Sequence, residues 1–96
     1  MHFLISRSFV NRTASTEIHV YARDPGRTML KPERTHVVYT ASEILRKLQS
    51  ELSELKKTRS RATFSYPIET EFMPRERTAI ARLFTRHNNL VSETKK

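Results

Sequence analysis

The clearest hydrophobic pattern in the chain lies in residues 40–59, TASEILRKLQSELSELKKTR. Apolar residues recur there at helical spacing and fall within an arc of about 100° on a helical wheel. These residues are Ala41, Ile44, Leu45, Leu48, Leu52 and Leu55. Thr40 and Glu43 have the spacing of a capping box, and basic residues follow where the helix dipole is negative. Together these signals predict an amphipathic helix.

The apolar stripe of this helix has two interpretations. Its four leucines, Leu45, Leu48, Leu52 and Leu55, follow the a and d positions of a heptad repeat for about two heptads. Coiled coils usually sustain this pattern for three or four heptads. The stripe therefore predicts a helix lying on a sheet, with a homodimer seam as the alternative.

Three stretches before this helix have strand patterns. Residues 3–10 are rich in β-forming side chains, and Phe3, Ile5 and Phe9 would share one face that Arg7 interrupts. Residues 17–23 alternate between apolar and polar side chains, as expected of a half-buried strand paired with the first. Residues 35–39, THVVY, predict a third strand that runs into the helix cap.

A turn separates the second and third of these strands. Asp24, Pro25 and Gly26 combine a side chain that bonds back to the backbone, a fixed φ and tolerance of positive φ. Residues 28–34 predict a loop or short edge strand, because Pro32 cannot donate to a central ladder. Gly26 is the only glycine, which excludes glycine-rich phosphate and dinucleotide loops.

The C-terminal third predicts one more strand and one more helix. Residues 62–72 alternate almost throughout, and Pro67 within them indicates an edge strand or a break. Pro74 can begin a helix, and Asn88 or Asn89 can end it. Its apolar side would contain Ile80, Leu83, Phe84, His87 and Leu90.

The predicted order is β-β-β-α-β-α, an α+β fold. We expect a mostly antiparallel sheet of about four strands with both helices on one face. The 96 residues include 23 Leu, Ile, Val and Phe, enough for one small core. We expect a single domain over residues 1–91 and a flexible tail over residues 92–96.

Composition narrows the classes of function. Cysteine is absent, which excludes disulfides and thiol chemistry and suits a reducing compartment, so we expect a cytoplasmic protein. No apolar run approaches the ~20 residues of a membrane span, and Arg7 interrupts any signal-peptide pattern. Eighteen Lys and Arg oppose ten Asp and Glu, giving a net charge of +8 that favours an anionic partner.

Residues with catalytic or metal-binding chemistry are few. The four histidines have no metal-ligand spacing, so we expect no metal and no cofactor. His19 and His36 would share the solvent face of neighbouring strands, where they could act as acid and base. Glu69 and Glu71 would share the outer face of one strand. No spacing demands catalysis from either pair, and we expect a protein that is not an enzyme.

Arginine is the most informative basic residue, because its planar fork suits phosphate and carboxylate. Two segments of basic residues are the candidate binding site. The site residues are Lys56, Lys57, Arg59 and Arg61 after the first helix, and Arg75, Arg82 and Arg86 on one side of the last. We interpret them as contacts to the phosphates of DNA or RNA in a non-enzymatic binding or regulatory protein. The alternative is a phage- or plasmid-type inhibitor that docks on a host enzyme or nucleoprotein complex.

Overall fold

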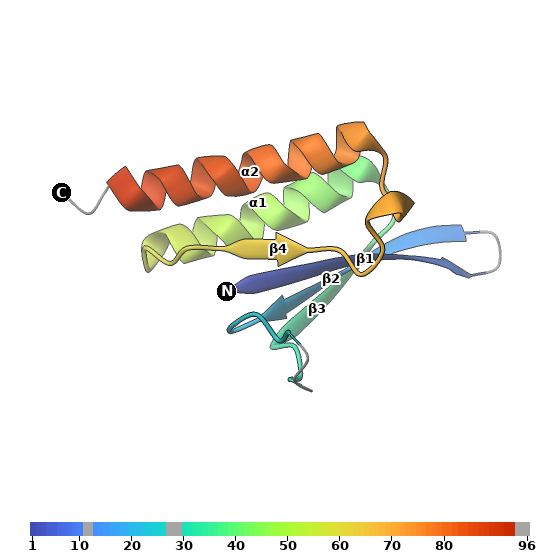
Figure 1. The fold of residues 1–96 in the computed structure, drawn as a ribbon, viewed down its shortest axis with the longest axis horizontal. Coiled ribbons are helices and arrows are strands. Elements are labelled where there is room, and N and C mark those ends of the chain that lie inside the picture. Colours follow the sequence, from blue (N-terminus) through green and yellow to red (C-terminus); the bar gives the residue numbers. More distant parts are fainter. Residues whose placement is uncertain (11–12, 27–29, 94–96) are drawn as a thin grey trace.

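A computed structural model describes residues 1–10, 13–26 and 30–93 of the protein. Its elements are β1 (His2–Val10), β2 (Thr13–Tyr21), β3 (Arg34–Val38), α1 (Ala41–Lys57), β4 (Thr63–Ser65), the 3₁₀ turn η1 (Glu69–Glu71) and α2 (Pro74–Glu93). The two helices lie side by side over one face of the sheet (Figure 1). This arrangement confirms the predicted α+β fold with a four-stranded sheet and two helices.

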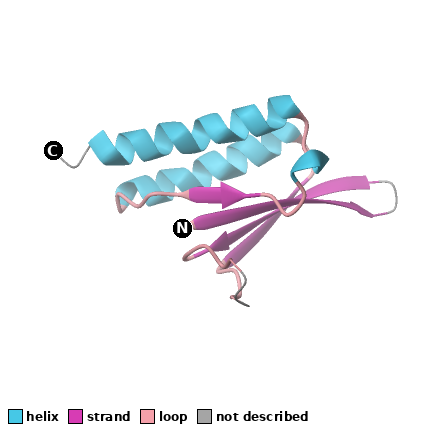
Figure 2. Cartoon of the chain, viewed as in Figure 1, coloured by secondary structure: helices cyan, strands magenta, loops and turns pink. Residues whose placement is uncertain are grey.

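The sheet is mixed and has the strand order β3-β2-β1-β4. β1 pairs antiparallel with β2 and parallel with β4, and β2 pairs antiparallel with β3 (Figure 2). In the β1–β2 register Phe3 lies opposite Val20, and Ile5 lies opposite Ile18. These four side chains are fully buried, so they form the floor on which the helices pack.

The apolar stripe of α1 faces this floor, as the first interpretation predicts. Thr40 caps the helix, accepting a hydrogen bond from the Glu43 backbone N–H at 3.2 Å. Leu48 and Leu52 are buried in the protein's own core, with Leu45 and Leu55 packed partly buried against it. A homodimer seam through these four leucines is not supported, because a partner helix would have to displace that core.

The first hairpin extends beyond the helix layer at one end. β1 and β2 project past the N-terminal ends of both helices (Figure 1). Phe9 lies on the same side of β1 as Phe3 and Ile5, as alternation predicts, yet 66% of its surface is exposed. Its predicted place in the apolar face is therefore correct, but none of the described elements packs over it.

The turn after β2 forms as the sequence predicts. Gly26 adopts φ of 53°, and its backbone N–H donates to Asp24 Oδ1 at 2.9 Å. The predicted loop or edge strand over residues 28–34 lies partly outside the described residues. At its end, Arg34 already belongs to β3, which is an edge strand of the sheet.

The predicted strand over residues 62–72 is wrong beyond Ser65. β4 contains only Thr63–Ser65, and Pro67 follows within a bend, at the break that proline indicates. The chain then forms η1 and returns Phe72 to the core, 2% exposed. The alternation of apolar residues thus arises from a strand and a turn that bury their apolar side chains separately.

The predicted end of the last helix is also wrong, because α2 continues to Glu93. Asn88 does not end the helix, since its side-chain amide pairs with the backbone of Ala62. It accepts from the Ala62 N–H and donates to the Ala62 carbonyl, both at 2.9 Å. The predicted boundary between domain and tail at residue 91 therefore falls inside α2, and residues 94–96 lie outside the described part of the chain.

Candidate nucleic-acid interface

Arg82 and Arg86 lie one helical turn apart on the outer side of α2. Both side chains are exposed, and no acidic partner is found for either within the described residues. They border a shallow hollow of about 630 Å³ that Thr85 and Asn89 also line. Arginine, threonine and asparagine side chains are common donors to phosphate oxygens.

The end of α1 adds positive charge beside these arginines. The two helices run in the same direction, so their C-terminal ends lie together (Figure 1). Lys56 and Arg86 line one hollow of about 160 Å³ between the helices. On the other side of α2, the Arg61 guanidinium donates to Ser92 Oγ at 3.1 Å. Lys56, Arg61, Arg82 and Arg86 form what we call the basic patch.

Lys57 and Arg59 adjoin the basic patch in the turn that ends α1. The Lys57 ammonium contacts the Glu54 carboxylate at 3.3 Å, and both side chains are largely exposed, so this pair contributes little to stability. Arg59 adopts φ of 55°, and its backbone N–H donates to the Lys56 carbonyl at 3.2 Å. The left-handed residue closes the helix as C-terminal caps do.

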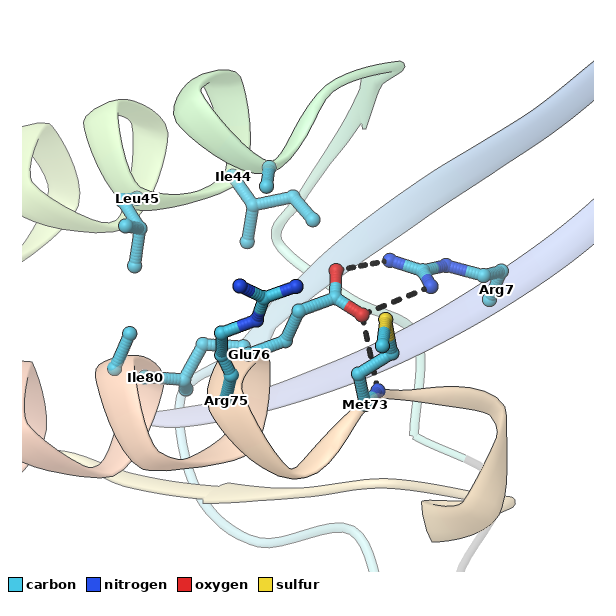
Figure 3. Close-up of a pocket in the computed structure, with 9 residues that line it drawn as sticks. Arg7, Ile44, Leu45, Met73, Arg75, Glu76 and Ile80 are labelled. Atoms are coloured by element: carbon cyan, nitrogen blue, oxygen red, sulfur yellow. Dashed lines mark hydrogen bonds and ion pairs between the residues drawn. The ribbon is translucent and has the colours of Figure 1, made fainter.

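Arg75 lines a different hollow from the basic patch. It lies seven residues before Arg82 and eleven before Arg86 on α2, which corresponds to about 10 and 16 Å along the helix. There it borders a hollow between the N-terminal halves of α1 and α2 (Figure 3). The structure thus brings Arg86 together with Lys56 at the end of α1, and places Arg75 at another hollow.

That second hollow contains a well-formed ion pair. The guanidinium of Arg7 donates to both oxygens of Glu76, at 2.8 and 3.2 Å, and stacks on the Phe72 ring with 4.5 Å between guanidinium carbon and ring centre. The hydrogen bonds from Arg7 lower the pKa of Glu76, with a further contribution from the Met73 backbone N–H. The Arg7 that interrupts the apolar face of β1 is therefore neutralised by α2.

A charged network that the sequence analysis missed joins β3 to α1. The Glu51 carboxylate accepts two hydrogen bonds from Arg34, at 2.8 and 2.9 Å, and one from His36 at 2.8 Å. Burial alone would raise the pKa of Glu51, but the hydrogen bonds from Arg34 and His36 outweigh it and the pKa is lowered. The sequence contains one signal of this network: Glu51 lies seven residues, or two helical turns, after Ile44, and so falls on the apolar side of the helix.

The prediction that His19 and His36 share a solvent face is wrong. His36 lies opposite Ile18 in the β2–β3 register, and therefore points toward the helices. His19 lies on the uncovered face, with Nδ1 3.1 Å from Thr35 Oγ1. The sheet separates the two imidazoles, so they cannot serve one reacting group as acid and base.

Glu69 and Glu71 do not share a strand face either, because both belong to η1. The Glu69 carboxylate accepts from Arg77 at 2.6 Å, which ties the turn to α2. The Glu71 backbone carbonyl accepts from Arg7 at 3.1 Å. These contacts position η1 and leave no paired carboxylates for acid–base chemistry there.

His2 is the most enclosed histidine. Its Nδ1 lies 2.7 Å from Thr63 Oγ1 and its Nε2 lies 2.8 Å from Ser65 Oγ, so it bridges β1 and β4. Burial lowers the pKa of His2, with Asp24 acting in the opposite direction. Within the described ranges, no three His, Cys, Asp or Glu residues are grouped to hold a metal ion.

Comparisons with protein-family models, with curated proteins and with solved structures give no match for this chain. The described helices include none that is long and apolar enough to cross a lipid bilayer. The function must therefore be inferred from the surface chemistry of the protein itself.

Proposed function

We propose that this protein is a non-enzymatic nucleic-acid-binding protein that contacts phosphates through the basic patch. The observation that carries the proposal is the pair Arg82 and Arg86, exposed on one side of α2 and without a carboxylate partner in the described chain. Lys56 and Arg61 flank the same end of the helix. Adjacent hydroxyl and amide groups supply uncharged donors to the same phosphates.

The distribution of ion pairs supports this location. Three other arginines, Arg7, Arg34 and Arg77, are each paired with a carboxylate at 2.6–2.8 Å. Those charges stabilise the fold and are largely compensated locally. The charge at the basic patch is not compensated in this way, so it remains available to attract a polyanion.

The proposal is tested by measuring binding to DNA and RNA oligonucleotides by fluorescence anisotropy over a range of salt concentrations. Phosphate binding releases counterions, so log K should fall linearly with log salt. Replacing Arg82 and Arg86 together with Ala should reduce this slope by about two units and weaken binding to all sequences alike. The double variant Arg23→Ala, Lys31→Ala is the matched control, because it removes the same charge from the loop after β2.

Two results would contradict the proposal. Equal losses in the two double variants would mean that only net charge matters and that the basic patch is not a site. No binding to either nucleic acid at low salt would favour the alternative, a protein-binding inhibitor. The exposed apolar side chains of Phe9 (66%) and Met73 (55%) are candidate anchors for such a protein partner.

A further inference from the structure

The hollow between the N-terminal halves of α1 and α2 has the features of a small-ligand site. Its volume is about 460 Å³, within the usual range of about 300–1,000 Å³ for ligand pockets. Six apolar residues form most of its wall: Ala41, Ile44, Leu45, Met73, Ala79 and Ile80. Its polar side chains are Arg7, Glu76 and Arg75. Apolar walls with a few polar groups are typical of sites that orient one ligand.

The polar groups leave one positive charge uncompensated. Both oxygens of Glu76 are occupied by Arg7, and one also accepts from the Met73 backbone N–H at 3.0 Å. The Arg75 guanidinium lies over the hollow, between the two helices, and no hydrogen bond or ion pair links it to the other lining residues (Figure 3). Two arginines and one glutamate give a local charge of +1, which an anion would neutralise.

The local charge of +1 distinguishes between the molecules that could occupy the hollow. The exposed Phe9 of a second copy would fit the apolar walls, but the segment around it, SFVNRTAS, brings no carboxylate and adds an arginine. A second copy would therefore leave Arg75 without an anion. The hollow is also short, spanning residues 41–45 of α1, Met73 and residues 75–80 of α2, which suits one small molecule.

We infer that this hollow binds a small amphiphilic carboxylate. Its apolar part lies against Ile44, Leu45 and Ile80, and its carboxylate accepts hydrogen bonds from the Arg75 guanidinium. A charge-assisted, bidentate contact of this kind would give the site its preference for acids over neutral molecules of the same shape. The inference is independent of nucleic-acid binding, because no residue of the basic patch lines this hollow.

The test is an NMR titration of ¹⁵N-labelled protein with 4-phenylbutyrate and, separately, its neutral amide, at moderate salt to screen diffuse attraction. We expect saturable shifts of amides in residues 41–45 and 75–80, with the acid binding about tenfold more tightly than the amide. Arg75→Gln should reduce the affinity for the acid to that for the amide. Arg23→Gln removes the same charge from the exposed loop after β2 and should leave both affinities unchanged.

A second variant locates the ligand. Ala79→Leu fills the hollow from α2 and should abolish binding of both probes, while the amide spectrum reports whether the variant is folded. Binding retained in folded Ala79→Leu protein, or equal losses in Arg75→Gln and Arg23→Gln, would overturn the inference. Equal affinities for acid and amide would overturn the role of Arg75. No saturable shift with either probe at millimolar concentration would overturn the site itself.

Discussion

Replacing Glu51 with Gln tests the network that joins the edge strand β3 to helix α1. The substitution keeps the size of the side chain but removes the charge that Arg34 and His36 share. A Gln side chain can also accept fewer hydrogen bonds from Arg34 and His36, because its amide N–H₂ replaces one acceptor oxygen with a donor. The result reports how much this network contributes to the free energy of unfolding.

The expected cost follows from the exposure of the three side chains. Breaking a fully buried ion pair costs about 3–5 kcal/mol, whereas an exposed pair contributes about 0.2–1 kcal/mol. The Glu51 side chain is 10% exposed, His36 24% and Arg34 47%, so water can resolvate the arginine after the change. We therefore expect a loss of about 2 kcal/mol, or roughly 8–16 °C in Tm for a domain of this size.

The assay is urea denaturation followed by circular dichroism at several pH values. The folded-state pKa of Glu51 is lowered, so its contribution is present above its unfolded pKa of about 4.3 and is lost as pH falls through the folded value. The difference between wild type and Glu51→Gln should be full above about pH 5 and shrink in stronger acid. Glu54→Gln is the control, because Glu54 is exposed and pairs only with Lys57 within the described chain. A Glu51→Gln loss below about 0.5 kcal/mol at pH 7, no larger than that of the control, would refute the reasoning.

Three further predictions concern stability, measured by the same denaturation assay. Asn88→Ala should cost about 1–3 kcal/mol, because it leaves the backbone N–H and carbonyl of Ala62 unpaired. The control Asn89→Ala should change stability by less than about 0.5 kcal/mol, because Asn89 is exposed. Similar losses in the two variants would show that the pairing of Asn88 with Ala62 is not needed for stability. Leu48→Ala should cost about 2–5 kcal/mol, since Leu48 is fully buried, and an unchanged midpoint would mean that this face of α1 is not packed. Tyr66→Phe should be neutral or stabilising, because the buried Tyr66 hydroxyl has no hydrogen-bond partner among the described residues, and a clear loss of stability would reveal a partner for it.

The parts of the fold that could be predicted are those in which several local signals agree. For α1, the cap at Thr40, the apolar stripe and the order of charges all indicate the same helix, and the structure confirms it. Alternation alone was less reliable. It predicts the buried faces of β1 and β2 correctly, but it extends β4 past Ser65. Phe72 fits the alternation by position, although it follows the turn η1 and belongs to no strand.

The remaining errors come from contacts between residues far apart in the chain. Asn88 has the local properties of a helix end, and its pairing with Ala62, 26 positions earlier, cannot be read from the residues around it. The same holds for Glu51, whose partners Arg34 and His36 are set by the register of β3 and the placement of α1. For the candidate site, the sequence identified the basic residues, but only the structure shows that Arg75 lines a different hollow from Arg82 and Arg86.

The parallel pairing of β1 with β4 has a consequence for how the protein is made. β1 is synthesised before the other strands, yet it lies inside the sheet and receives its second neighbour only when Thr63–Ser65 emerge from the ribosome. Until α1 and α2 follow, the apolar face of the first hairpin has no cover, and Val91, 1% exposed, comes from the last turn of α2. We therefore expect this part of the nascent chain to remain unfolded, and open to chaperones, until all of α2 has been synthesised.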